Sequence, residues 1–365
     1  MKYHINYGIQ NTQTLTKRII TLIAVAVSCV GLAVGIPLSA HAAGCTSVTT
    51  SKGNLTAAQV GGNVTGEVNA TGCDIGAYFN ADNPGQVKNA SIHDANQYGV
   101  FVDGNVASDT KVNVTNSEVY NIGNHSAGVF APNGNQTGLG IYFAGFNSVG
   151  TASGNISGND VSQYQKGGIA INGENANANV RGNDVTGLAN VPFIAQNGIQ
   201  FGYGATGQAQ NNTVDGNWYT GANWASTGIL VFESDNVNVD KNTVTNNQVG
   251  VDAESWCYFG VPSANNNKFV NNTISGADYG AIVAAYSLYS DCDAQANNNK
   301  VTNNTISGTD SADSEGIFVG TYVYTGSYSP ETKNNKVIHN DVSGFETAQD
   351  TSGDATAKVH ANSFQ

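Results

Sequence analysis

Two carboxylates, Asp252 and Glu254, stand two residues apart after Gly250. Residues two apart on a β-strand point to the same face, so both would project from the outer face of a strand that begins at this glycine. Glu233 and Asp235 occur in the bend that follows the preceding strand. Oxygen ligands so placed could hold Ca²⁺, but a dedicated calcium site uses more of them. A solvated acidic patch is the alternative interpretation.

A second polar strip is predicted around Lys166. Lys166 and Gln196 occupy the same place, two residues before a glycine, in neighbouring repeats, with Gln165 and Gln200 close by. A lysine removed from water can act as a base. A solvated surface lysine is the alternative. Lys166, Asp252 and Glu254 are therefore candidates for catalysis, and no catalytic residue is assigned.

Aromatic residues gather where repeats are lengthened. Two such stretches are Gly187–Asn197 and Gly216–Thr227, and three more cover 254–264, 285–296 and 321–333. We expect loops there, and all three tryptophans fall in them. Flat apolar rings with polar edges suit stacking on sugars, whereas packing of the loops on one another is the alternative. The predicted ligand-contacting residues are Gln196, Gln200, Trp218, Tyr219, Trp224, Trp256, Tyr258, Tyr286 and Tyr289.

These residues are positioned by a repeat whose centre is V-x-x-N-x-V. Its asparagines are Asn159, Asn183, Asn212, Asn242, Asn272, Asn304, Asn340 and Asn362, spaced by 22 to 36 residues on subtraction. Such periods are typical of solenoids. An apolar residue three places before each asparagine breaks strand alternation, so the asparagine lies at a bend. Stacked coils would let these amides hydrogen-bond as an asparagine ladder, with Ala90 and Ser117 in the ladder place of earlier coils.

A second motif, glycine-apolar-x-apolar, occurs once per repeat. It starts at Gly99, Gly140, Gly168, Gly198, Gly228, Gly250, Gly280 and Gly316. Each copy predicts a short strand with two inward side chains. The two motifs together predict an all-β chain: a single-stranded parallel β-helix of about ten coils.

The N-terminus reads as a targeting segment. Lys17 and Arg18 precede an apolar run from Ile19 to Ile36, followed by a small-residue site that ends at Ala42. We predict a signal peptide at 1–42, an N-terminal cap and first coil at 43–86, and the β-helix at 87–365. Cleavage removes three basic residues, so the net charge falls from −13 to −16, which disfavours nucleic acid and anionic lipid as partners. A membrane is a partner only if this segment is retained or Cys45 is lipidated.

Four cysteines remain after cleavage, and in an exported protein they favour disulfides. Cys45 and Cys73 fall in the N-terminal region and would staple the cap. Cys257 and Cys292 follow equivalent strands of neighbouring coils, about 4.8 Å apart, which is within the range that a disulfide spans. We expect these two pairs. The histidines show no metal-ligand spacing.

With the ladder, three stretches carry a family resemblance: NATGCDIGAYF from Asn69, YQKGGI from Tyr164 and IAQNGIQFGYGATG from Ile194. The chain resembles secreted bacterial proteins with right-handed parallel β-helix repeats, which have the pectate-lyase-like fold. The resemblance covers the mature chain and implies a right-handed β-helix, but activity in the superfamily ranges from lyases, hydrolases and epimerases to surface proteins without catalysis. Its lyases use a basic residue beside bound calcium, whereas Arg181 is expected on a different face from Lys166.

We therefore expect a secreted or cell-surface β-helix protein without catalytic activity that contacts extracellular or cell-wall polysaccharide through its aromatic loops. The first alternative is a polysaccharide lyase or glycoside hydrolase that acts in a groove near Lys166, Gln196, Asp252 and Glu254. The second is a rigid adhesin or stalk. No cofactor is expected, and Ca²⁺ only under the lyase alternative. Charge is sparse, at 11% of residues, whereas enzymes of this superfamily gather several charged groups in one groove.

Overall fold

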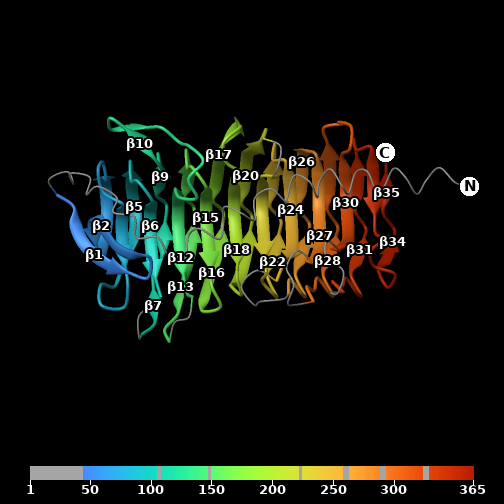
Figure 1. Ribbon diagram of the computed structural model, residues 1–365, viewed down its shortest axis with the longest axis horizontal. Coiled ribbons are helices and arrows are strands. Elements are labelled where there is room, and N and C mark those ends of the chain that lie inside the picture. Colours follow the sequence, from blue (N-terminus) through green and yellow to red (C-terminus); the bar gives the residue numbers. More distant parts are fainter. Residues whose placement is uncertain are drawn as a thin grey trace, which may run out of the picture.

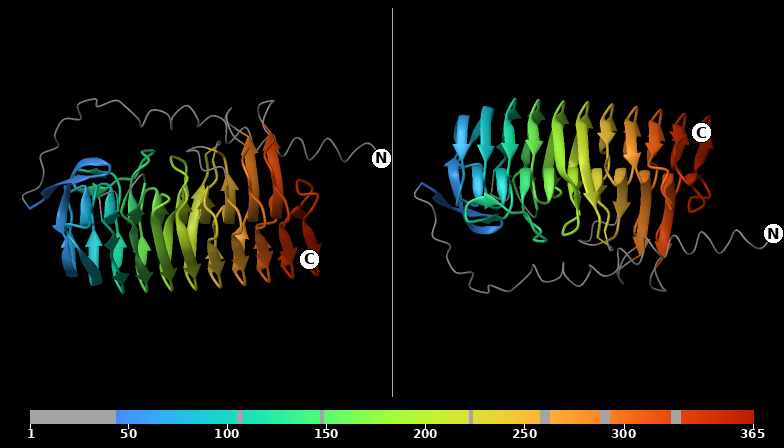
Figure 2. Two further views of the ribbon diagram at one scale, coloured as in Figure 1. Left: turned by 90° about the horizontal axis from the view of Figure 1, so that it is seen from below. Right: turned by 90° about the horizontal axis from the view of Figure 1, so that it is seen from above.

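The computed structural model describes residues 44–104, 108–146, 149–221, 224–257, 263–287, 293–323 and 329–365. All regular elements in these ranges are β-strands. The chain winds in successive coils that stack along one axis into an elongated solenoid, from the hairpin at one end to the C-terminal coil at the other (Figure 1). The views of Figure 2 show the coils side by side along the whole length. No helix of the described ranges is long and apolar enough to span a bilayer.

One long sheet, which we call sheet A, receives one strand from each coil. After the antiparallel β1–β2 hairpin, its neighbouring strands pair in parallel. Its 12 strands, in spatial order, are β1 (Thr46–Thr50), β2 (Gly53–Val60), β4 (Ile75–Phe79), β6 (Tyr98–Asp103), β12 (Leu139–Ala144), β15 (Gly167–Asn172), β18 (Asn197–Gly202), β21 (Thr227–Phe232), β24 (Val249–Ser255), β27 (Tyr279–Ser287), β30 (Glu315–Val323) and β33 (Thr347–Asp350).

The other sheet, sheet B, has 21 strands, because most coils contribute two strands that flank the asparagine corner. A separate hairpin joins β10 (His125–Ser126) to β11 (Val129–Phe130). The strands of sheet B are β3 (Gly62–Asn69), β5 (Gly85–His93), β7 (Thr110–Lys111), β8 (Val114–Thr115), β9 (Glu118–Tyr120), β13 (Ala152–Ser157), β14 (Asp160–Ser162), β16 (Ala176–Arg181), β17 (Asp184–Val191), β19 (Thr206–Gln210), β20 (Thr213–Tyr219), β22 (Asn238–Asp240), β23 (Thr243–Thr245), β25 (Lys268–Val270), β26 (Thr273–Ala277), β28 (Lys300–Thr302), β29 (Thr305–Gly308), β31 (Lys336–Ile338), β32 (Asp341–Ser343), β34 (Lys358–His360) and β35 (Ser363–Phe364).

The core lies between the two sheets and is filled by the inward apolar residues of the two motifs. Val244, Ile229 and Val231 are completely buried there. The motif glycine is required by close packing: a Cβ on Gly228 would lie 2.5 Å from Cγ1 of Val244 and 2.8 Å from the carbonyl oxygen of Gly250. The predicted glycine strands are confirmed, since all eight motif glycines lie in strands of sheet A.

The predicted asparagine ladder is also confirmed. From Asn159 to Asn340, the side-chain amide of each ladder asparagine donates to Oδ1 of the next one at 2.9 to 3.1 Å. The residue before each asparagine makes the bend, as Lys241 does with φ of 56°. Ser117 takes the ladder place as predicted, because its N–H donates to Asn159 and its hydroxyl accepts from Ala90.

A second ladder, which the sequence analysis missed, stands at another inner corner of the C-terminal coils. Backbone N–H groups donate to the side-chain oxygens of Asn267, Asn299 and Asn335 in turn, each at 2.8 to 2.9 Å. The series ends at Asp354, which accepts from Asn335. Its sequence signal is the run N-N-N-K at 265–268 and 297–300, followed by N-N-K at 334–336.

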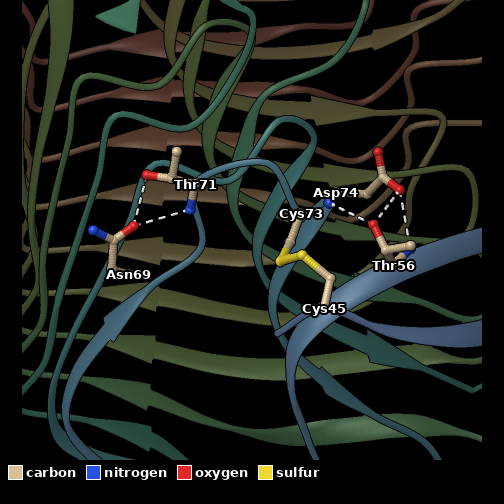
Figure 3. Close-up of a disulfide and its surroundings, with 6 residues drawn as sticks. All are labelled: Cys45, Thr56, Asn69, Thr71, Cys73 and Asp74. Atoms are coloured by element: carbon tan, nitrogen blue, oxygen red, sulfur yellow. Dashed lines mark hydrogen bonds between the residues drawn. A yellow bond between two sulfur atoms is a disulfide. The ribbon is translucent and has the colours of Figure 1, made fainter. Parts of the chain in front are cut away.

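The N-terminal hairpin is stapled to the first coils by the predicted disulfide between Cys45 and Cys73 (Figure 3). Beside it, Asp74 accepts hydrogen bonds of 2.9 Å from the N–H and the hydroxyl of Thr56. Lipidation at Cys45 would use the same sulfur atom, so this disulfide and a lipid thioether exclude each other. Cys257 is also disulfide-bonded, whereas its predicted partner Cys292 lies outside the described residues.

Each of the five expected loop regions begins as the end of a strand. Trp218 and Tyr219 lie in β20, where they pair with residues 190 and 191 of β17, and Tyr286 lies in β27 opposite Tyr322 of β30. The prediction that all tryptophans lie in loops is therefore wrong for Trp218. The physical reason is that neighbouring coils are lengthened at the same place, so their extra backbone groups can pair with each other.

Candidate functional site

Aromatic side chains form a continuous file, which we call the aromatic line, where the strands of sheet A end. Ring centroids of successive members lie 4.9 to 5.7 Å apart. The line starts after β12 and reaches the extended end of β30, so it runs parallel to the solenoid axis. Its members are Phe146, Tyr203, Phe232, Trp256, Tyr286 and Tyr322.

The two halves of the aromatic line differ in exposure. Phe146, Tyr203 and Phe232 are partly exposed. Trp256, Tyr286 and Tyr322 are only 8%, 2% and 8% exposed. The open half is therefore the N-terminal one, and the C-terminal half belongs to an apolar cluster on the outer face of sheet A.

Several predicted ligand-contacting residues lie in or beside this buried half. Trp224 is partly exposed and its ring stacks on Trp256, with centroids 6.2 Å apart and planes 8° apart. Tyr286 and Trp256 pack inside the aromatic line. Tyr258 and Tyr289 lie outside the described residues. Among the described residues, packing of aromatic rings on one another, the alternative stated above, thus applies to Trp256 and Tyr286.

Trp218 and Tyr219 lie near the amino ends of the sheet A strands, away from the aromatic line. Both are partly exposed in β20, whose chain turns into the start of β21. The aromatic line follows the opposite, carboxyl ends of the strands of sheet A. The structure therefore does not place Trp218 and Tyr219 in the aromatic line, although Trp224 of the same turn reaches it.

Asp252 and Glu254 project from the outer face of β24, beneath this aromatic cover. Asp252 is 5% exposed, and its Oδ1 has no hydrogen-bond partner within the described part of the chain. Burial, reinforced by the charge of Glu254, raises the pKa of Asp252 well above its usual value. Burial likewise raises the pKa of Glu254 to about 7. The nearby Trp256 indole lowers this pKa, and the charge of Glu233 raises it further. Both carboxyls therefore hold protons at pH values where an exposed carboxyl is ionised.

This electrostatic setting determines which chemistry the pair can support. A carboxyl that is protonated near neutral pH can act as a general acid. Calcium binding needs ionised or carbonyl oxygens in larger number. In the described ranges, no three His, Cys, Asp or Glu side chains are grouped so that they could hold a metal ion.

Lys166 and Gln196 have structural partners. Nζ of Lys166 donates a 2.7 Å hydrogen bond to the carbonyl of Ala195, and burial lowers the pKa of Lys166 to about 8. Gln196 is fully buried. Its side-chain amide donates a hydrogen bond to the carbonyl of Tyr164, and its Oε1 accepts one from the N–H of Leu188. Both side chains thus fix the lengthened turn before β18.

The structure does not bring Lys166 to the carboxylates. Lys166 precedes β15, which is three strands from β24 in sheet A, a separation of roughly 14 Å. Gln200 lies between them on the outer face of β18, where it accepts from Asn197 and donates to Asn172 at 2.9 Å each. The predicted groove residues therefore form two separate polar places rather than one active site.

Phe146, Tyr203 and Phe232 are the site residues that the sequence analysis missed. Each is an aromatic residue at or just past the end of a glycine strand, and that recurrence was the available signal. Their side-by-side placement depends on turn lengths, which differ between these coils.

Known proteins resemble the chain in fold. A family model described as "Right handed beta helix region" matches residues 76–293. A mutant of the periplasmic alginate epimerase AlgG is similar in structure, with 12% identity, a TM-score of 0.44, and 85% of this chain and 77% of that chain covered. The A-module of Azotobacter vinelandii mannuronan C-5 epimerase AlgE4 has 12% identity and a TM-score of 0.43, covering 85% and 87%.

The Dettilon tailspike protein is also similar, with 16% identity, a TM-score of 0.40, and 84% of this chain and 62% of that chain covered. No curated protein sequence matches the chain. At these identities, the structural likenesses show the fold alone.

Proposed function

The chain belongs to the right-handed β-helix family, and from this premise we propose that it binds a polysaccharide along the aromatic line, without catalysis. The observation that carries the proposal is the continuity of that line over coils stacked along one axis. The open half of the line extends from β12 to β21, which are three strand steps apart in sheet A, or roughly 14 Å at the usual strand spacing. A linear polymer parallel to the axis would meet one rigid surface along this length.

The open half of the aromatic line supplies the chemistry that sugars need. Phe146, Tyr203 and Phe232 offer partly exposed ring faces for stacking. Beside them, the partly exposed Gln200 carries an amide group on the outer face of sheet A. Amides both donate and accept, so they can pair with sugar hydroxyls.

We place this activity outside the cytoplasm. The Cys45–Cys73 disulfide supports the placement, because disulfides persist in oxidising compartments. The apolar segment from Ile19 to Ile36 preceded by Lys17 and Arg18 agrees with export. We propose that the protein is secreted or held at the cell surface.

A polysaccharide lyase or glycoside hydrolase is the second candidate, favoured by the raised pKa values of Asp252 and Glu254. A carboxyl that is protonated near pH 7 can donate a proton to a glycosidic oxygen. Lys166 lies too far away to serve as the base in the same site. The catalytic candidate therefore rests on the carboxyl pair alone.

The test is a polysaccharide pull-down and glycan array with the purified protein, with reducing ends and unsaturated products recorded in the same samples. Tyr203→Ala/Phe232→Ala should reduce binding at least tenfold, whereas the control Trp218→Ala, away from the line, should retain it. Loss of binding only in Trp218→Ala would move the site to β20. Product that accumulates with time and disappears in Glu254→Gln would establish the enzyme. If neither binding nor product is detected, the rigid adhesin or stalk remains as the function to test.

A further inference from the structure

Four lysines form a straight row on the outer face of sheet B. Lys268, Lys300, Lys336 and Lys358 are direct register partners on β25, β28, β31 and β34. The next residue of each of the first three strands is buried in the core, so the lysines point outward. We call them the lysine row. The four strands that carry it pair one after another along the solenoid axis, and β28, β31 and β34 can be followed in Figure 1.

The fold does not require lysine at this position. In earlier coils the same register position holds Asn155, Asn179, Gln208 and Asn238, the last directly opposite Lys268. Asn179 donates to Asn155 at 3.1 Å, so neutral amides satisfy one another between coils. The change from amides to lysines therefore replaces favourable contacts by charge repulsion.

Within the described part of the chain, no carboxylate pairs with the lysine row to offset the repulsion between its members. Like charges directly opposite on neighbouring strands are destabilising. None of the four ammonium groups forms a salt bridge with another described residue, whereas Lys241 pairs with Asp240 at 3.8 Å and Lys333 pairs with Glu331. This arrangement concentrates positive potential on one face of a chain whose net charge is −13.

The row lines two adjoining grooves. One has a volume of about 470 Å³ and the other about 200 Å³, and both include Lys300. An asparagine row borders the lysines in these grooves: Asn236, Asn266, Asn298 and Asn334. Cations along a groove with amides beside them match a ligand with regularly spaced anions and hydroxyl groups.

We propose that the lysine row binds a linear anionic polysaccharide, with its carboxylates on the ammonium groups and its hydroxyls on the asparagine row. The polymer would run parallel to the solenoid axis, one lysine per coil. Sites for single-stranded nucleic acid combine a basic groove with aromatic platforms. Here the positions on the other side of the row are Val270, Thr302, Ile338 and His360, of which only the last is aromatic. This site lies on sheet B and is independent of the aromatic line on sheet A.

The experiment measures binding of the purified protein to immobilised polygalacturonate, with neutral dextran and oligo(dT) as comparison polymers. Lys300→Gln/Lys336→Gln should weaken polygalacturonate binding at least tenfold. The matched control Lys88→Gln/Lys111→Gln removes the same charge from exposed lysines near the other end and should retain binding. Asn238→Lys extends the row by one coil and should tighten binding. Raising NaCl from 50 to 200 mM should weaken binding by about tenfold or more. Binding of the lysines releases counterions from the polymer, and added salt opposes that release.

Equal losses in the two double variants would show a general charge effect and overturn the proposal. Binding that is insensitive to salt, or equally strong to dextran, would overturn it as well. Tighter binding to oligo(dT) than to polygalacturonate would replace the polysaccharide by nucleic acid. Tyr203→Ala/Phe232→Ala should leave the salt-dependent binding intact, which separates this site from the aromatic line.

Discussion

Asn242 donates its side-chain amide to Oδ1 of Asn272 at 3.0 Å, and the two residues occupy the same corner of neighbouring coils. The same amide also reaches the carbonyl of Ala209, and Oδ1 of Asn242 accepts from the N–H and the amide of Asn212. The buried polar groups of three coils thus depend on one side chain.

Asn242→Ala should lower the free energy of unfolding by about 3 kcal/mol, because buried groups of Asn212 and Ala209 lose a partner and each such loss costs about 1 to 3 kcal/mol. Urea unfolding checks this value. The control Thr243→Ala changes the neighbouring exposed residue and should stay within about 0.5 kcal/mol of wild type. Equal effects of the two substitutions would mean that the ladder contributes little.

Removal of the N-terminal staple should loosen the hairpin on sheet A. Cys45 and Cys73 are 28 residues apart, and a disulfide that closes a loop of this size stabilises by about 3 kcal/mol. Cys45→Ser/Cys73→Ser should therefore unfold at lower urea concentration and exchange amide hydrogens faster in β1 and β2. Unchanged exchange in β1 and β2 would contradict this role.

The pKa of about 7 for Glu254 predicts how stability varies with pH. The folded state binds this proton more tightly than the unfolded state, so the stabilisation is complete below the unfolded pKa and is lost as pH rises towards 7. Glu254→Gln should remove this dependence, which is on the order of 1 to 3 kcal/mol between pH 4 and 8. Thermal unfolding across this range measures it.

A matched control for this experiment is Asp310→Asn, which removes one exposed carboxylate elsewhere on the surface. Its pH profile should follow that of the wild type. A Glu254→Gln profile that also follows the wild type would show that this carboxyl is ionised in the folded protein.

Tyr286 tests whether the buried half of the aromatic line is structural. Its ring packs between Trp256 and Tyr322 at 5.4 and 4.9 Å. Tyr286→Ala should cost about 3 to 5 kcal/mol, as expected for removal of a buried aromatic ring, whereas the partly exposed Tyr203→Ala should cost about 1 kcal/mol. Comparable losses in urea unfolding would contradict the difference in burial.

The sequence analysis predicted the coil architecture because that architecture depends on local patterns. The V-x-x-N-x-V corner and the glycine strand each specify one bend and one inward pair, and stacking follows from their repetition. The Asn159–Asn362 ladder and the Cys45–Cys73 disulfide could therefore be predicted. The second ladder, through Asn267 and Asn299, has an equally local signal in its N-N-N-K runs and could have been found in the same way.

The candidate sites depended on relations between coils of unequal length. Trp218 extends a strand and Tyr203 joins the aromatic line, because turn lengths decide which residues of neighbouring coils meet. Burial under aromatic rings raises the pKa of Glu254. The amino-acid sequence does not indicate which carboxyl the aromatic rings will cover. Net charge alone indicated an acidic surface, whereas strand register aligned Lys268, Lys300 and Lys336 on one face. Sequence by itself determined the repeating coil, since its contacts recur at a nearly fixed spacing; only the tertiary structure decided which side chains of different coils share a surface.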